Sequence, residues 1–255
     1  MRIENSFIPV EGVGESTERR LWKRGITTWD EFDSAVDVRG VGSTTADRIE
    51  TFIAEARAHL DDDDATYFDR TFPSRERWRL YENFRDETCF FDIETTGLDE
   101  RRDRVTTVSF HRAGETTTLV AGRDLTADRL REEFADASLL ATFNGARFDV
   151  PFLETSFGID VDTPHLDLMY PCKRLDLSGG LKPIEKRLGI DRDRPDLSGR
   201  DAVRLWHEYE RGDESSLETL VSYNREDTEN LRTLADVVCE SLHEDVFAPA
   251  ITDRS

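Results

Sequence analysis

The sequence predicts an α/β protein in which a small helical domain precedes a mixed sheet flanked by helices. Two observations support this fold class. A glycine-containing pentapeptide occurs twice before residue 60, and β-rich stretches within residues 89–143 precede helical periodicity after residue 180. With 255 residues, the chain is long enough for one large domain and one small domain.

The N-terminal domain, expected at residues 1–60, contains an internal repeat. Residues 10–14 read VEGVG and residues 38–42 read VRGVG, and Ser16 and Ser43 follow as candidate helix caps. The expected helices are residues 17–23 and 45–58, and Trp29, Phe32 and Val36 between them have helical spacing and should pack inward. The repeat therefore predicts two helix–turn–helix units with glycine-rich turns.

Residues 61–87 are expected to connect the two domains. The segment begins with the acidic run Asp61–Asp64, which is typical of a solvated linker or helix end. The aromatic residues that follow predict a helix that packs on the larger domain.

The larger domain is expected at residues 88–245, followed by a tail at 246–255. The expected strands are residues 89–94, 104–111, 116–120 and 138–143, with a short strand or turn at 165–169. The expected helices are residues 127–135, 147–157, 181–188, 199–210 and 216–242. Strands that come first and helices that come later indicate a mixed sheet covered by helices.

The formal net charge of −21 has the wrong sign for a protein that binds phosphates by long-range attraction. One interpretation is that the protein never contacts nucleic acid. The other is adaptation to solvent, because only four of the 34 basic residues are lysines and the surface is rich in acids. Such surfaces are typical of proteins in a very salty cytoplasm, where the Debye length is roughly 3 Å at molar salt. Nucleic-acid affinity would then come from hydrogen bonds, stacking and metal ions.

The remaining composition indicates a soluble, cytoplasmic protein without a membrane partner. Cys89, Cys172 and Cys239 are far apart and form no metal-binding pair, so we expect buried thiols in a reducing compartment. No apolar run approaches the ~20 residues that span a bilayer, and the N-terminus has no secretory pattern.

The first chemical motif is the segment 91–97, FDIETTG, at the end of an apolar strand. Asp92 and Glu94 alternate along this strand, so both side chains point to one face. Two acids on one face repel each other, and a divalent cation is their natural partner; solvated acids at a strand end are the alternative. The following small residues and Gly97 would let a nucleotide backbone approach.

Two further motifs supply acids. In residues 141–153, ATFNGARFDVPFL, an apolar strand leads through an Asn-Gly turn into a helix whose first turn holds Asp149. The alternative for Asp149 is a simple interaction with the helix dipole. In residues 223–228, YNREDT, Tyr223 and Asp227 are four residues apart and share a helix face.

Together these motifs resemble the DEDD exonuclease superfamily, in its tyrosine-containing subgroup. The motifs occur in the order Asp-x-Glu-Thr, Asn-Gly-x-x-Phe-Asp-x-Pro-Phe-Leu and Tyr-x-x-x-Asp. With the stretch at 180–190, GLKPIEKRLGI, the chain is still more similar to RNase H-like exonucleases of the YprB type over about residues 88–242. The N-terminal repeat resembles a tandem helix-hairpin-helix domain.

The resemblance implies an RNase H-like, mixed five-stranded sheet and hydrolysis of phosphodiester bonds from a 3′ end. Asp92, Glu94, Asp149 and Asp227 would hold two Mg²⁺ or Mn²⁺ ions about 3.5–4 Å apart. Tyr223 would orient the attacking water, since a phenol with a pKa of roughly 10 is a poor base at neutral pH.

The resemblance also implies contacts to nucleic acid, DNA or RNA, at a single-stranded 3′ end. The backbone of Thr95 and the side chain of Leu98 would hold the terminal nucleotide, and Asn144 the penultimate one. Lys182 would contact a phosphate, although a plain surface lysine is an equal alternative, and His165 and Asp167 are expected to support the site rather than bind metal. Backbone N–H groups in the N-terminal turns would contact phosphates; the glycines concerned are Gly12, Gly14, Gly40 and Gly42.

Two other functions stay open at this point. The chain could be a nucleic-acid-binding protein that keeps the fold without turnover, and the complete set of acids argues against that. It could also be a structure-specific endonuclease of the RNase H type, whose internal cuts would differ from the single-nucleotide products of an exonuclease.

Overall fold

The structure, a computed structural model, describes residues 1–252, which form two compact units. One unit comprises Met1–Arg85 with the chain from Val237 onward, and the other comprises Asp86–Asp236. The expected boundary at residue 245 falls instead inside one long helix, α10 (Glu214–Val246).

In the first unit, the repeated pentapeptide folds into the same turn twice. Gly12 has φ +93° and Gly40 has φ +96°, which favour glycine. In both turns the amide of the second valine donates to the carbonyl oxygen of the first at 2.9 Å. The helices that follow are α1 (Glu15–Lys23) and α2 (Ser43–Asp61). The predicted helix–turn–helix repeat is therefore present in the backbone.

The helix caps differ from the expectation. Gly14 and Gly42 occupy the N-cap positions, both with extended backbone, and Ser16 and Ser43 lie inside the first helical turns. The turns end directly at the glycines, so no residue is left between turn and helix for a serine cap. Trp29 begins a short 3₁₀ helix, η2 (Trp29–Glu31), and is buried, whereas Phe32 and Val36 are only half-buried. The predicted inward-packing helix over these three residues was wrong.

Residues expected to form a linker are folded into this unit. They form α3 (Ala65–Thr71), η3 (Ser74–Leu80) and α4 (Tyr81–Phe84), and η4 (Arg85–Glu87) follows at the boundary with the second unit. A further short helix of the first unit, η1 (Ile3–Asn5), lies near the start of the chain. Arg79 is fully buried and joins Glu18 at 2.9 Å and Glu76 at 2.8 Å.

The expected tail at 246–255 is largely helical. Helix α11 covers Ala248–Thr252, and the ring of Phe247 contacts Trp22 edge to face at 5.0 Å between centroids. Buried residues continue to Ala250, so apolar packing holds the end of the described chain. Residues 253–255 of the expected tail lie outside the described residues.

The second unit contains the predicted mixed sheet of five strands, in the order β3-β2-β1-β4-β5. Strands β1, β2 and β3 are antiparallel neighbours, while β1, β4 and β5 run parallel. The strands are β1 (Thr88–Thr95), β2 (Val105–Arg112), β3 (Glu115–Val120), β4 (Leu139–Thr142) and β5 (His165–Asp167). The predicted fold class is confirmed.

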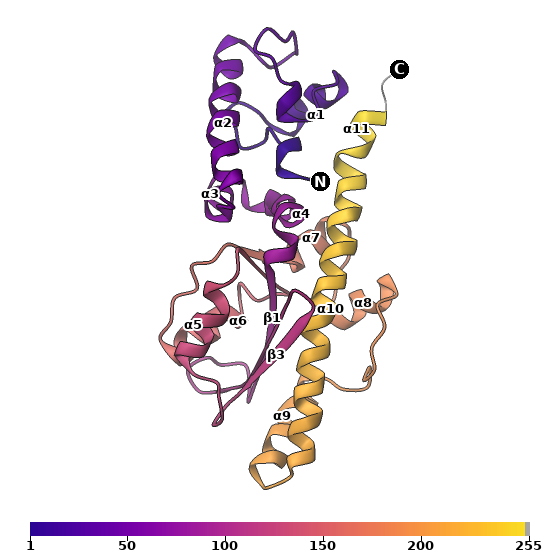
Figure 1. Cartoon of the computed structure of the whole chain (residues 1–255). Helices are drawn as coiled ribbons and strands as arrows, with labels where there is room; N and C mark the ends of the chain where they lie inside the picture. The colour runs from indigo at the N-terminus through magenta and orange to yellow at the C-terminus, as the bar shows by residue number, and fades with distance from the viewer. Residues whose placement is uncertain (253–255) are drawn as a thin grey trace. The chain divides into compact units, whose positions relative to one another are not determined.

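The helices of this unit cover both faces of the sheet (Figure 1). They are α5 (Ala127–Ala135), α6 (Asp149–Phe157), α7 (Met169–Arg174), α8 (Leu181–Leu188), α9 (Gly199–Glu210) and the first part of α10. Helices α5 and α6 pack on one face over the odd-numbered side chains of β1, Cys89, Phe91 and Ile93. The even-numbered side chains, which include Asp92 and Glu94, therefore point to the opposite face, where α10 lies.

The cysteines and the lengths of the apolar helices bear on two further expectations. The three cysteines are buried and free, and burial raises the pKa of Cys89 and of Cys172 to about 12, so both stay protonated. None of the helices in residues 1–252 combines the length and the apolar character needed to cross a bilayer.

Candidate metal centre

The candidate site is built on the central strand β1. Asp92 lies opposite Ser109 of β2, and Glu94 lies opposite Thr107, so the two acids occupy consecutive inward positions on one face. The register shifts directly after Glu94, and this irregularity ends the regular ladder beside the acids. Glu94 is only 9% exposed.

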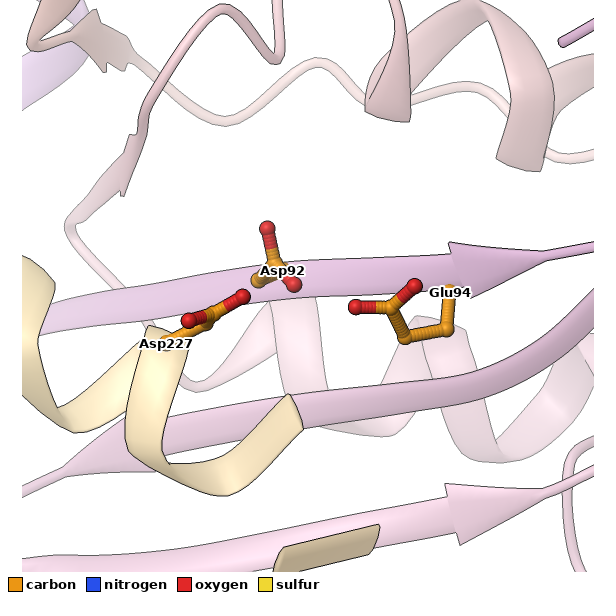
Figure 2. A group of neighbouring side chains, drawn as sticks. All are labelled: Asp92, Glu94 and Asp227. Atoms are coloured by element: carbon orange, nitrogen blue, oxygen red, sulfur yellow. The ribbon is translucent and has the colours of Figure 1, made fainter. Parts of the chain in front are cut away.

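Helix α10 brings a third acid to this strand. One carboxylate oxygen from each of Asp92, Glu94 and Asp227 lies within 4.8 Å of the others. Figure 2 shows the three carboxylates turned toward a common space between β1 and α10. The arrangement places three candidate ligands from two distant parts of the chain around one point.

Asp149, the fourth expected acid, stands beside this group rather than within it. It is the first residue of α6 and is 4% exposed. One of its carboxylate oxygens accepts a hydrogen bond from the backbone N–H of Ile93 at 3.2 Å. This bond ties the start of α6 to β1 between Asp92 and Glu94.

Burial and mutual repulsion make these acids reluctant to ionise together. Burial raises the pKa of Asp92, and the charges of Asp149, Asp227 and Glu94 raise it further. Burial and the neighbouring acids likewise raise the pKa of Glu94. Burial also raises the pKa of Asp149 to about 7. For Asp227, burial raises the pKa while Arg192 opposes that effect.

A neutral side chain, Asn224, orients Asp92. The Asn224 amide donates to the Asp92 carboxylate at 2.8 Å and to the Asp92 carbonyl oxygen at 3.2 Å. Its own carbonyl accepts from the hydroxyl of Ser109 at 2.9 Å, and Asn224 is fully buried. Sequence reasoning assigned no role to Asn224, although its position directly after Tyr223 on the same helix could have suggested one.

Tyr223 lies one helical turn before Asp227 and is 4% exposed. Burial, followed by the charges of the acids, raises its pKa above the ordinary value, and its hydroxyl is hydrogen-bonded to Asp227. The phenol therefore stays protonated and acts as a hydrogen-bond donor at the edge of the acidic cluster.

Two cationic side chains lie beside the acidic cluster, Lys182 in α8 and Arg192 shortly after that helix. Lys182 lies 4.5 Å from the centre of the Tyr223 ring, and its ammonium group donates to the carbonyl oxygen of Leu197. The guanidinium group of Arg192 contacts both Asp227 and Glu185. Lys182 was predicted to contact a phosphate, whereas Arg192 was missed because no periodic pattern covers residues 190–198. Glu185, inside the predicted helix 181–188, was missed because its role depends on its contact with Arg192.

The remaining predicted contact residues lie around the carboxyl ends of β1 and β4. Leu98 follows β1 and is 84% exposed. Asn144 follows β4 with φ +67°, and its N–H donates to Asp167 at 2.7 Å. Asp167 also accepts from Met169 N–H at 3.0 Å, so it joins the ends of β4 and β5.

The glycine after the first motif has a local explanation. A Cβ atom at Gly97 would lie 2.3 Å from the carboxylate of Asp103, so the space beside Gly97 is already filled. The prediction that Gly97 leaves room for a nucleotide backbone is not supported by this packing. Thr95, two residues before Gly97, is buried at the end of β1. The predicted glycines of the N-terminal turns belong to the other unit.

The side chains present suit a hard divalent cation. Mg²⁺ and Mn²⁺ prefer oxygen ligands, and the centre offers carboxylate oxygens from Asp92, Glu94 and Asp227, with Asp149 adjacent. Neither Asp92 nor Glu94 is bonded to a cationic side chain among the ion pairs of the described residues. A bound cation would offset the repulsion that raises the pKa values of these acids.

The family model of the RNase H superfamily matches residues 89–239, which is more than half of the chain. The chain belongs to this superfamily.

Several solved structures align with the chain. The family B DNA polymerase of the archaeon Pyrobaculum calidifontis aligns with a TM-score of 0.51 and 18% identity over 65% of this chain and 26% of the polymerase. Brucella melitensis NrnC with bound Mg²⁺ aligns with a TM-score of 0.47 and 22% identity over 68% of this chain and 82% of NrnC. A nuclease in its apo form aligns with a TM-score of 0.47 and 23% identity over 65% of this chain and 78% of the nuclease. No curated protein sequence matches the chain.

Proposed function

We propose that the protein is a metal-dependent 3′–5′ exonuclease that hydrolyses phosphodiester bonds of DNA or RNA. The observation that carries this proposal is the convergence of Asp92, Glu94 and Asp227 within 4.8 Å, with Asp149 bonded to the strand between the first two. Superfamily membership is consistent with it.

The four carboxylates would hold two divalent cations, Mg²⁺ or Mn²⁺, as metal ligands. Bound ions would supply an activated water and stabilise charge on the phosphate and on the leaving oxygen. Asn224 holds the Asp92 carboxylate in one orientation, and the N–H of Ile93 does the same for Asp149. Tyr223, a protonated donor beside Asp227, would orient the attacking water by a hydrogen bond.

A nearby cavity provides a place for the substrate backbone. It measures about 600 Å³, and its walls include Lys182, Lys186 and Arg192 beside Glu185. Two of the four lysines of the chain thus line one cavity with Arg192, and the acids Glu185 and Asp191 also line it, so three basic groups face two acidic ones there although the net charge of the chain is −21. The exposed Leu98, the backbone of Thr95 and Asn144 would contact the last nucleotides of a single-stranded 3′ end, and Lys182 a phosphate.

The N-terminal unit would hold nucleic acid through its two glycine turns, as a tandem helix-hairpin-helix domain. Both turns lead into helices whose N-caps, Gly14 and Gly42, carry no side-chain cap bond, so backbone N–H groups are presented at helix N-termini. Gly12 and Gly40 allow the positive φ that each turn requires. Neutral donors of this kind suit a high-salt cytoplasm, where long-range attraction is screened.

A substrate panel tests the proposal. The full chain in molar KCl with Mn²⁺ is incubated with single-stranded and duplex DNA and RNA, each labelled at the 5′ end and blocked or free at the 3′ end. We expect a ladder of products that shorten by one nucleotide, and no products from strands whose 3′ end is blocked.

The control is Asp92→Ala, which should leave every substrate intact. Equal cleavage by wild type and Asp92→Ala, or no cleavage by either, would rule out the exonuclease. Early internal cuts would instead indicate an endonuclease, and binding without cleavage would indicate a nucleic-acid-binding protein.

A further inference from the structure

Arg192 forms a bridge between a buried acid and the acidic cluster. Two nitrogens of its guanidinium group donate hydrogen bonds to the two carboxylate oxygens of Glu185, one of them at 2.9 Å. The third nitrogen donates a hydrogen bond to the carboxylate of Asp227. The side chain of Arg192 is 5% exposed and that of Glu185 is 1% exposed. All three groups are therefore largely shielded from water. Hydrogen bonds between charged groups are strong in such surroundings.

The backbone on both sides of Arg192 is attached to α10. The carbonyl oxygen of Asp191 accepts from the Asn230 amide at 3.3 Å, and the N–H of Asp193 donates to Glu226. Glu226 and Asn230 lie one residue before and three residues after Asp227. The segment is therefore fixed to the same part of α10 that carries Asp227.

Charge balance decides what this bridge does when a cation is present. Because Glu185 pairs with Arg192 through two hydrogen bonds, the pair is neutral by itself. Arg192 therefore adds little net charge to oppose an incoming divalent cation. It occupies one oxygen of Asp227, and a carboxylate has about four lone-pair positions on two oxygens, so capacity for a metal remains.

We propose that Arg192, held by Glu185, is a positioning residue that fixes the Asp227 carboxylate for metal binding. Hydrogen-bonded neighbours of metal ligands commonly act in this way, and their loss costs about 10–100-fold in metal affinity. The proposal rests on the proposed function only in taking Asp227 as a metal ligand. The opposite role, a latch that competes with the metal for Asp227, predicts tighter binding when Arg192 is removed.

The test measures Mn²⁺ affinity directly, by the electron paramagnetic resonance signal of free Mn²⁺ in molar KCl. The variants are Arg192→Gln, Glu185→Gln, the double variant and the control Arg204→Gln, which removes an exposed arginine that pairs with Glu208 at 2.9 Å. We expect Arg192→Gln to weaken binding by about 10–100-fold. Glu185→Gln should weaken it less, and Arg204→Gln should match wild type.

The double variant separates positioning from general damage. Since Glu185 acts through Arg192, the double variant should bind Mn²⁺ as Arg192→Gln does, rather than showing the product of both effects. Arg192→Lys, which keeps the charge but cannot bind both carboxylates in the same way, should lie between wild type and Arg192→Gln. At saturating Mn²⁺, kcat of Arg192→Gln should recover to within about tenfold of wild type.

Unchanged or tighter Mn²⁺ binding by Arg192→Gln would overturn the proposal, and so would independent effects of the two substitutions. Circular dichroism establishes that each variant is folded, and if Arg192→Gln fails to fold, the isosteric Glu185→Gln decides the outcome in the same assay. Wild-type Mn²⁺ binding without hydrolysis would refute the exonuclease and leave this inference standing. Hydrolysis by wild type, with Mn²⁺ affinity unchanged in Arg192→Gln, would support the exonuclease and refute the positioning role of Arg192.

Discussion

At the scale of single residues, the centre combines acids that repel each other with neutral groups that hold them still. Asp92 illustrates both effects, because burial and three neighbouring acids raise its pKa while Asn224 and Ser109 fix its orientation. Ionising these acids together costs electrostatic energy when no cation is bound, and a bound cation offsets that cost. The acids could be predicted from the spacing of the motifs, whereas Asn224 and Arg192 could not, since they contact Asp92 and Asp227 across more than 30 residues of sequence. Glu185 could not be predicted because its role depends on Arg192, to which it is hydrogen-bonded.

The titration of Asp149 gives a prediction for the metal-free protein. Burial raises its pKa to about 7 from the ordinary 3.8, so the folded state binds a proton that the unfolded state has already lost. The contribution of protonated Asp149 to the free energy of unfolding is fully present below about pH 4 and is lost as pH rises through 7. In chelator, we expect the melting temperature to fall over this window, and Asp149→Asn should reduce that fall by roughly 5 °C.

Thermal melts at fixed high salt and several pH values measure this effect. Asp128→Asn, a change at a residue whose side chain is 90% exposed, serves as the control and should keep the wild-type slope. A wild-type slope in Asp149→Asn would contradict the assigned environment. Added Mn²⁺ should stabilise wild type more at pH 8 than at pH 5, because the ligands must be deprotonated.

The hydroxyl of Tyr223 gives a second prediction at this scale. Tyr223→Phe removes only the donor beside Asp227, so we expect kcat to fall about 100-fold while Mn²⁺ affinity stays near wild type. Tyr209→Phe, in α9, is the matched control and should keep full activity. Loss of Mn²⁺ binding in Tyr223→Phe would show that the hydroxyl supports the metal ligands instead of the water.

At the scale of helices and strands, hydrophobic periodicity determined what could be predicted. The helices α5, α8 and α9 have the predicted bounds, because their apolar stripes and end residues are clear. The short helix α7 was missed, since six residues that include a proline show little periodicity. The N-caps at Gly14 and Gly42 were missed because serine is the commoner cap and the turn geometry is not visible in composition.

The N-terminus of α2 tests the role proposed for the glycine turns. Ser43 is exposed in the first turn, and Ser43→Glu adds a negative charge there. The helix dipole should favour this charge by about 0.3–1 kcal/mol, whereas a bound phosphate would be repelled. We therefore expect unchanged or slightly higher stability together with roughly tenfold weaker binding of a long single strand.

The control for this prediction keeps the same helix and the same net charge. Thr51→Glu places an exposed glutamate two turns further along α2, away from the N-terminus. Fluorescence anisotropy with a labelled strand should show weaker binding for Ser43→Glu alone. Equal binding by both variants would exclude this helix end as a phosphate contact.

At the scale of the whole molecule, the order of strands and helices predicted the fold class, and composition predicts a high-salt solvent, which stays a prediction. The predicted mixed sheet is confirmed, but the division of the chain was less accessible to sequence reasoning. Helix α10 runs from Glu214 to Val246 without a break, so no linker marks the point where one unit ends and the other resumes. A boundary inside a continuous helix leaves no proline, glycine or polar segment by which to predict it.

The net charge of −21 predicts a strong dependence of stability on salt. Screening of repulsion between the 55 acidic residues should raise the melting temperature by roughly 10 °C between 0.2 M and 2 M KCl. Sucrose at matched osmolality is the control for non-ionic stabilisation and should give a smaller rise. A melting temperature that is equal at both KCl concentrations would contradict the solvent adaptation.

The central claim is that Asp92, Glu94, Asp149 and Asp227 form one centre for two divalent cations. The most direct measurement is a crystal structure of the full chain grown with Mn²⁺ and a non-hydrolysable strand, with anomalous differences recorded for manganese. The account predicts two anomalous peaks between β1 and α10, about 3.5–4 Å apart, with oxygens of these acids as ligands. Peaks confined to surface acids, with an ordered strand but no manganese at this centre, would contradict it.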